Sequence, residues 1–141
     1  MEIVCSRCKA INRVPTERLQ DGPVCGACKH PILPPEPVEL TTDNFDAVIA
    51  RSGLPVMVDF WAPWCGPCRS MAPMYAEAAR QLHGRAVLAK VDTEAQPALA
   101  ARFGIRSIPT LAIFRTGHEV AREAGARPAP EIVRWVTPYL E

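Results

Sequence analysis

Apolar positions along the chain fall into strand-like runs and helix-like stripes from residue 38 onward. Residues 55–62 and 86–91 form two nearly continuous apolar runs, which are typical of strands covered on both faces. Between them, residues 66–83 carry an apolar side chain every three or four positions, which predicts an amphipathic helix. The apolar side of that helix comprises Met71, Met74, Tyr75, Ala78 and Leu82.

Two short helices are predicted on either side of this unit. Thr42 is placed to cap the first one, since threonine at a helix start accepts from free backbone N–H groups. The apolar side chains of that helix are Phe45, Val48 and Ile49. Residues 96–103 predict the second, which Gly104 ends.

The C-terminal part predicts a hairpin and a last helix. A Thr-Gly pair at 116–117 separates the apolar runs 111–114 and 118–121, which is a hairpin signal. Pro130 stands at a helix start, and Ile132, Val133, Val136 and Leu140 follow at helical spacing. Pro138 lacks a backbone donor and should kink or end that helix just before it. The order strand–helix–strand–helix–strand–strand–helix predicts an α/β fold with a mixed central sheet flanked by helices.

Proline content divides the chain of 141 residues. Four prolines in residues 31–37 predict a stiff, extended, non-helical linker. It separates a cysteine-rich module, residues 1–30, from the periodic segment at 38–141. We therefore expect one ordinary domain with a small N-terminal module.

Charge excludes some partners. The net charge of +1 offers no general attraction to nucleic acid or to anionic membranes.

No apolar run approaches the ~18 residues that span a bilayer. The first residues lack the basic and apolar stretches of a secretory signal, which predicts a cytoplasmic protein.

The six cysteines form three Cys-x-x-Cys pairs with none left over. Cytosolic thiols stay reduced, which favours metal binding or redox catalysis over structural disulfides. The pair Cys65 and Cys68 lies where a predicted strand feeds a predicted helix. The unpaired N–H groups of a helix N-terminus stabilise a thiolate, so we expect the pKa of Cys65 to lie below the ordinary thiol value. Cys68, one turn later, is placed to form a disulfide with it. A third metal half-site or two structural thiols are the alternatives.

The other two pairs have the spacing of a metal site. Cys5, Cys8, Cys25 and Cys28 follow the pattern C-x2-C-x16-C-x2-C. Four thiolates are the ligand set of structural zinc, and a module of this size needs the metal to fold. Iron in a rubredoxin-like site, two disulfides, or replacement of a ligand by His30 are the alternatives. Residues 1–30 carry five Lys or Arg and three Asp or Glu, a net charge of +2 that one zinc tetrathiolate cancels, so a nucleic-acid role is not expected.

Asp59 interrupts an otherwise apolar predicted strand. A buried carboxylate is costly unless it is paired, so its pKa should be raised, which suits proton exchange with a nearby thiol. The alternative is that Asp59 faces water.

Residues 60–68, Phe-Trp-Ala-Pro-Trp-Cys-Gly-Pro-Cys, and 104–110, Gly-Ile-Arg-Ser-Ile-Pro-Thr, closely resemble the thioredoxin family. The resemblance covers about residues 38–141 and implies the thioredoxin fold and protein disulfide reductase activity. Its implied partners are disulfide-containing proteins as substrates and an NADPH-dependent thioredoxin reductase as electron donor. Ser107 departs from the glycine that many members carry there.

The resemblance also implies roles for single residues. It gives Asp59 the task of deprotonating the resolving thiol, Cys68, with Lys90 as its charged neighbour. It also implies that the Ile108–Pro109 bond is cis, although X–Pro bonds are trans by default. On residue chemistry alone, a solvated strand-end lysine explains Lys90 nearly as well as this role. The implied substrate surface comprises Trp64, Gly66, Pro67, Ile108, Pro109, Gly125 and Ala126.

The cysteine-rich module and residues 10–15 extend the resemblance to thioredoxin 2, the zinc-containing bacterial subfamily. It predicts a monomer that holds one structural zinc ion and no organic cofactor. Two other functions remain open: a docking protein that uses the zinc module, and a redox sensor that releases zinc. A dithiol oxidase or isomerase is less favoured, because those relatives usually have histidine between the two cysteines.

Overall fold

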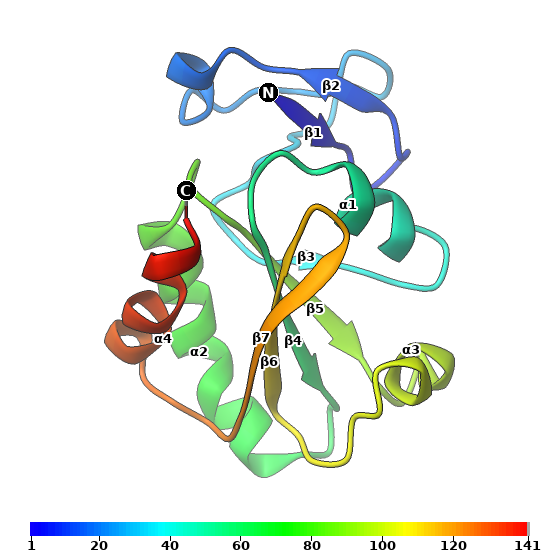
Figure 1. Cartoon of the computed structure of the whole chain (residues 1–141), viewed down its shortest axis with the longest axis vertical. Helices are drawn as coiled ribbons and strands as arrows, with labels where there is room; N and C mark the ends of the chain where they lie inside the picture. Colours follow the sequence, from blue (N-terminus) through cyan, green and yellow to red (C-terminus); the bar gives the residue numbers. More distant parts are fainter. Residues whose placement is uncertain (141) are drawn as a thin grey trace.

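The computed structural model describes residues 1–140 and centres on a five-stranded mixed sheet (Figure 1). The strand order is β3-β5-β4-β6-β7, in which β3, β5 and β4 are parallel and β6 and β7 are antiparallel to their neighbours. The strands are β3 (Val38–Glu39), β4 (Val56–Trp61), β5 (Val87–Asp92), β6 (Thr110–Arg115) and β7 (His118–Ala124). The predicted mixed sheet between helices is confirmed.

Helices cover both faces of the sheet. On one face, α1 (Phe45–Arg51) and α3 (Pro97–Arg102) bury apolar side chains, among them Phe45 and Leu99, against β4 and β6. On the other, α2 (Gly66–Gln81) and α4 (Ala129–Val136) pack on Met57, Leu111 and Ile113. Within residues 1–140, no helix combines the length and apolar character that a bilayer crossing requires.

The predicted elements lie within a few residues of the observed ones, but Thr42 does not cap a helix. The helix starts at Phe45, and the residue in the capping position is Asn44, whose side chain accepts from the Thr41 backbone N–H at 2.7 Å. Strand β3 was not predicted, because its two residues carry no periodic signal of their own. It forms by pairing with β5, where Val38 lies opposite Ala89 and Glu39 opposite Lys90.

Turn and proline chemistry set the C-terminal half as predicted. Thr116 (φ 48°) and Gly117 (φ 85°) both have positive φ, which the two-residue turn between β6 and β7 requires. Helix α4 ends at Val136 and passes into a 3-10 turn at Thr137–Tyr139, because Pro138 cannot continue the helical hydrogen bonds. Pro73 lies inside α2, within the helix predicted over residues 66–83.

The N-terminal residues form a small unit beside one end of the sheet, while α2 begins at the other end (Figure 1). Its hairpin pairs β1 (Glu2–Val4) with β2 (Ile11–Arg13), and a 3-10 turn follows at Thr16–Arg18. The backbone N–H of Gly53 donates to Glu2 O at 2.8 Å, and Lys9 pairs with Asp43 at 2.9 Å. These contacts tie the unit to α1 and the turns around it.

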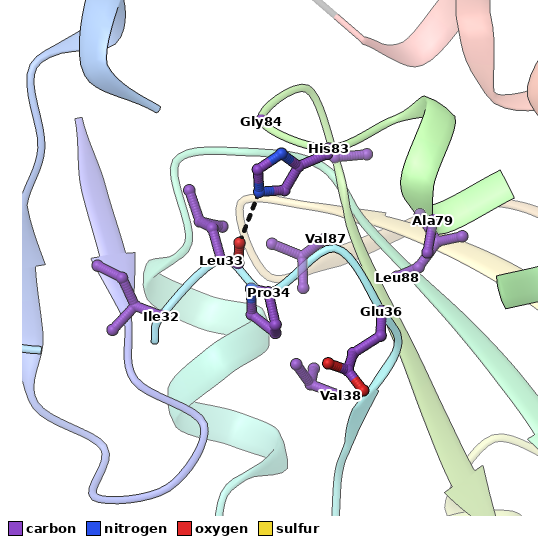
Figure 2. Close-up of a pocket in the computed structure, with 11 residues that line it drawn as sticks. Ile32, Leu33, Pro34, Glu36, Val38, Ala79, His83, Gly84, Val87 and Leu88 are labelled. Carbon is purple, nitrogen blue, oxygen red and sulfur yellow. Dashed lines mark hydrogen bonds between the residues drawn. The ribbon is translucent and has the colours of Figure 1, made fainter. Parts of the chain in front are cut away.

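Residues 31–37 are non-helical, as predicted, but they do not stand apart from the body. Ile32 and Leu33 are buried in a cluster shared with Leu54 and with side chains of the N-terminal unit. His83 lies against this segment, with its Nε2 atom 2.7 Å from Leu33 O (Figure 2). The linker is therefore a packed strap between the two parts of the chain.

Candidate functional site

Strand β4 and helix α2 place Cys65 and Cys68 at the far end of the sheet from the N-terminal unit. Cys65 is the N-cap of α2, and its Sγ atom accepts a hydrogen bond from the Cys68 backbone N–H at 3.2 Å. The two residues form a disulfide with their Cα atoms 5.2 Å apart. The predicted pairing of these two sulfurs at a helix start is confirmed.

Both cysteine residues are buried, and Cys65 is the more exposed of the two. Cys65 is 5% exposed and Cys68 only 1%. Beside them, Gly66 and Pro67 are exposed, and Trp64 is 67% exposed, which is unusual for so large an apolar side chain. A partner molecule can therefore reach Cys65 more easily than Cys68, across an apolar rim.

The loop before β6 closes over the disulfide. The Ile108–Pro109 peptide bond is cis. The Ile108 carbonyl oxygen lies 3.7 Å from Cys65 Sγ, and Pro109 O accepts from the Gly125 N–H at 2.9 Å. Ala126 follows Gly125 and is exposed. The structure thus brings the residues predicted to form a substrate surface to one side of Cys65; their role in binding stays a prediction.

Asp59 lies in the middle of β4, only 1% exposed, on the sheet face that α2 covers. Burial raises its pKa to about 7, although Lys90 lowers it, and the negative charge of Glu39 raises it further. Its Oδ1 atom has no hydrogen-bond partner among residues 1–140. The expectation that Asp59 faces the interior with a raised pKa agrees with this position.

Lys90 is half-buried on β5, opposite Asp59 in the parallel register. Its Nζ atom lies 4.2 Å from the centre of the Trp61 ring, a cation–π arrangement. It is therefore a neighbour of Asp59 rather than a freely solvated strand-end lysine.

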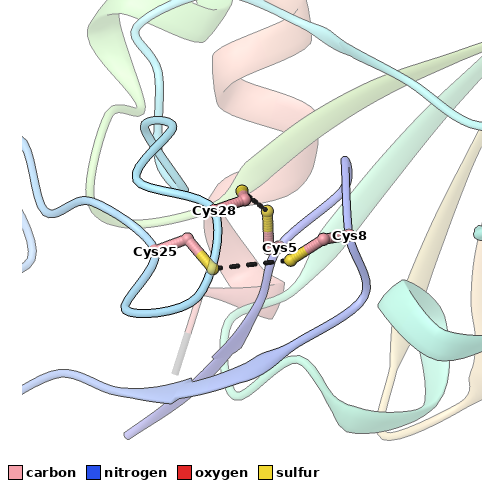
Figure 3. A group of neighbouring side chains, drawn as sticks. All are labelled: Cys5, Cys8, Cys25 and Cys28. Atoms are coloured by element: carbon pink, nitrogen blue, oxygen red, sulfur yellow. Dashed lines mark hydrogen bonds between the residues drawn. The ribbon is translucent and has the colours of Figure 1, made fainter.

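The four remaining cysteines meet in the N-terminal unit (Figure 3). All four Sγ atoms lie within 4.8 Å of one another, and the Cys5–Cys28 and Cys8–Cys25 pairs are 3.6 Å apart. Disulfide sulfurs lie ~2.05 Å apart, so these are free thiols. Sulfurs on a tetrahedral zinc ion, with bonds of ~2.3 Å, lie ~3.8 Å from each other. The cluster therefore fits one tetrahedral metal ion.

The two cysteine pairs are built alike. Lys9 N–H donates to Cys5 O at 2.8 Å, and Lys29 N–H donates to Cys25 O at 2.9 Å. Both lysines have φ of 68°. Each pair is thus a tight turn that points two sulfurs at a common centre, whereas His30 contributes its backbone oxygen, which accepts from Cys25 N–H.

Hydrogen-bond donors lower the pKa of one thiol of the cluster, whereas burial and the neighbouring thiols raise the pKa of another. The Cys28 and Ala27 backbone N–H groups and the Asn12 amide lower the pKa of Cys25 to about 6, against the effect of burial. Although the Ala10 N–H lowers the pKa of Cys8, burial and the three other thiols raise it to about 12. A fully ionised cluster therefore needs a positive ion at its centre.

Asn12 and Glu39 are contributors that the sequence did not indicate. Asn12 donates from Nδ2 toward Cys25 Sγ at 3.6 Å and accepts from Gly26 N–H at 2.9 Å. Its place in the segment after Cys8 was the only signal for it. Glu39 had no signal in the sequence, because only the pairing of β3 with β5 brings it near Asp59.

Comparison with known proteins covers the whole chain. Residues 36–138 match the Thioredoxin family, and residues 4–30 match the family described as Thioredoxin 2, N-terminal, a zinc ribbon. Thioredoxin C-3 of Corynebacterium nephridii is 49% identical over 141 residues, which is 100% of this chain and 97% of that protein. Thioredoxin 1 of a Nostoc species is 43% identical over 102 residues, covering 72% of this chain and 95% of its own.

A solved structure agrees with these sequence matches. A mutant thioredoxin from Halobacterium salinarum NRC-1 superposes with a TM-score of 0.69 at 32% identity, covering 77% of this chain and 94% of its own.

Proposed function

This chain belongs to the thioredoxin family and is a thiol–disulfide oxidoreductase, and we propose that it acts as a protein disulfide reductase. The observation that carries the proposal is the Cys65–Cys68 disulfide at the start of α2, bordered by an exposed apolar rim. In the reduced protein, the free N–H groups of α2 stabilise a thiolate on Cys65. That thiolate is the proposed nucleophile.

The first step joins the enzyme to its substrate. The Cys65 thiolate attacks one sulfur of the substrate disulfide, a new S–S bond forms to Cys65, and the substrate S–S bond breaks. The departing substrate sulfur leaves as a thiolate and takes a proton from solvent. Trp64, Gly66, Pro67, Ile108, Pro109, Gly125 and Ala126 are proposed to hold the substrate chain beside Cys65 during this step.

The second step releases the product. Asp59, ionised, accepts the proton of the Cys68 thiol, and the Cys68 thiolate attacks Cys65 Sγ. The Cys65–Cys68 bond forms and the mixed disulfide breaks, which frees the second substrate thiolate. Two electrons have then passed from the enzyme dithiol to the substrate. Lys90 is proposed to tune Asp59 through its charge.

Turnover requires a reductant. We propose that an NADPH-dependent thioredoxin reductase returns the Cys65–Cys68 pair to the dithiol, as the family implies. A coupled assay with NADPH, a bacterial thioredoxin reductase and insulin tests this. Insulin-dependent NADPH oxidation supports the proposal, and a reductase that leaves the disulfide intact contradicts this part of it.

The cysteine cluster is proposed to hold one structural zinc ion through Cys5, Cys8, Cys25 and Cys28. Zinc prefers four thiolates in tetrahedral array, and all four ligand positions are filled by protein, so the ion supplies folding energy rather than chemistry. No residue of this cluster takes part in the disulfide exchange proposed above. A cytoplasmic monomer is the setting we propose.

The titration of Asp59 gives a first prediction. The folded-state pKa of about 7 exceeds the ordinary value of 3.8, so the native state holds this proton more tightly than the unfolded chain. The contribution of Asp59 to stability is therefore fully present below about pH 4 and is lost as pH rises through 7, a change on the order of 4 kcal/mol. Because Asp59→Asn carries no charge at any pH, it should gain stability over the wild type by that order between pH 4 and pH 8.5.

Urea unfolding of the oxidised proteins at pH 4 and pH 8.5 measures this difference. The exposed Asp21→Asn variant serves as the control and should track the wild type at both pH values. A stability difference between Asp59→Asn and the wild type that does not change with pH would show that Asp59 is not a buried, high-pKa group.

A further inference from the structure

Three charged side chains lie in one row across the parallel part of the sheet. Asp59 on β4 is opposite Lys90 on β5, and Lys90 is opposite Glu39 on β3. Partners in register point to the same face of a sheet, so all three side chains lie on the face that α2 covers. Lys90 therefore has a carboxylate on each side, and only one of them, Asp59, is enclosed by the core.

The strand that carries Glu39 is fixed by contacts at both of its ends. Leu40 N–H donates to Lys90 O at 2.9 Å, which continues the pairing with β5. Asn44 Nδ2 donates to Glu39 O at 3.2 Å and to Ser6 O at 2.7 Å. Ser6 lies between Cys5 and Cys8, so the amide that holds Glu39 also holds the first turn of the cysteine cluster.

Few other ionisable groups lie close enough to Asp59 to influence its protonation. From β5 it faces Lys90, from β6 the apolar Leu111, and from α2 Tyr75, whose hydroxyl donates to Met57 O and Ala89 O. Cys68 lies on the same side of α2, two turns before Tyr75. Burial also raises the pKa of Glu39, which Lys90 lowers and Asp92 raises.

We propose that Glu39 is a positioning residue for the resolving step: by sharing Lys90 with Asp59, it weakens the hold of Lys90 on the ionised Asp59 carboxylate, so that Asp59 binds the proton released by Cys68 more readily. Without Glu39, Lys90 acts on Asp59 alone and favours its ionised form. The inference rests on the proposed function, since it assigns Asp59 the role of proton acceptor for Cys68. It adds that the edge strand, anchored to the cysteine cluster through Asn44, sets the pH at which Asp59 works.

The size of the effect follows from the spacing of the strands. Two strand intervals separate Asp59 from Glu39, a distance of ~10 Å. Charges at that distance, in surroundings between water and the protein interior, shift each other's titration by about 0.3 to 1 pH unit. A shift of this size changes the ratio of ionised to protonated Asp59 by about two- to tenfold.

The test compares Glu39→Gln with Glu36→Gln in the full-length, zinc-loaded protein. Glu36 is an exposed glutamate of the strap and is not in the charged row, so its variant removes the same charge from the same neighbourhood. The Asp59 carboxyl is titrated by carbon-13 NMR, and the pH dependence of release of a trapped mixed disulfide is measured in parallel. We expect Glu39→Gln to move both midpoints down by about 0.3 to 1 unit, with Glu36→Gln unchanged.

The outcomes distinguish a failure of the inference from a failure of the proposed function. An unchanged Asp59 midpoint in Glu39→Gln, or an equal shift in Glu36→Gln, overturns the inference while the reductase proposal stands. A shifted NMR midpoint without a shifted release profile overturns the role in the resolving step. In an Asp59→Asn background, Glu39→Gln should no longer move the release profile, and a shift that persists there also contradicts the inference. Failure of the unmodified protein to reduce insulin contradicts the proposed function itself.

Discussion

Replacing Cys65 by serine is expected to abolish insulin reduction, with a fall of at least about a thousandfold in turnover. A serine hydroxyl is not ionised at neutral pH and forms no S–S bond, so the first exchange step has no nucleophile. Cys68 cannot substitute, since it is 1% exposed and lies within the first turn of α2. Turnover is measured as insulin precipitation with dithiothreitol as reductant.

Cys68→Ser is the matched control, because it removes the same atom from the neighbouring position and leaves the nucleophile in place. It should lose turnover but accumulate a mixed disulfide with substrate, which Cys65→Ser cannot do. Mass spectrometry after incubation with a peptide disulfide distinguishes the two. A mixed disulfide that forms in Cys65→Ser and not in Cys68→Ser would reverse the roles assigned to the two sulfurs.

Replacing Cys25 by serine is expected to remove the metal ion and unfold the N-terminal unit. Binding of structural zinc to four cysteines supplies about 10 to 16 kcal/mol, which a unit of this size cannot replace by burying apolar surface. The loss should extend to the cluster of Ile3, Leu19, Ile32, Leu33 and Leu54, which joins that unit to the body. Metal content by atomic emission, with nitrogen-15 NMR spectra of residues 1–33, measures both effects.

Ser6→Ala is the control within the same turn, since Ser6 contributes its backbone oxygen and should keep one zinc per chain. Insulin reduction by Cys25→Ser should fall much less than in Cys65→Ser, because the disulfide lies at the far end of the sheet. An unchanged fold after loss of the ion would contradict a structural role. Iron in the purified wild-type protein would instead favour the rubredoxin-like alternative.

Local sequence patterns were sufficient to predict the elements whose pattern extends over several neighbouring residues. The two buried strands, the long helix and the Thr116–Gly117 turn each depend on side chains close together in sequence, so their predicted bounds lie within a few residues of the observed ones. The placement of Cys65 at a helix start follows from the same local signal. Both cysteine sites are therefore predictable from the spacing of residues along the chain.

Features that depend on distant partners could not be found this way. Strand β3 has two residues and exists because β5 pairs with it, so neither the strand nor the charged row through Glu39 has a local signature. Thr42 satisfied the rules for a helix cap, but the Asn44 side chain bonds back to Thr41 and the helix starts later. The prolines of the strap predict a spacer, while the burial of Ile32 and Leu33 depends on surfaces elsewhere in the chain.

The test that bears most closely on the chemistry is the rate and site of alkylation in the reduced, zinc-loaded protein at pH 7. Because α2 stabilises a thiolate on Cys65, iodoacetamide should modify Cys65 before every other cysteine, and at least about ten times faster than free cysteine. Peptide mass spectrometry identifies the modified sulfur. Prior modification of Cys68, or a Cys65 rate no greater than that of free cysteine, would contradict the assignment of Cys65 as the activated nucleophile.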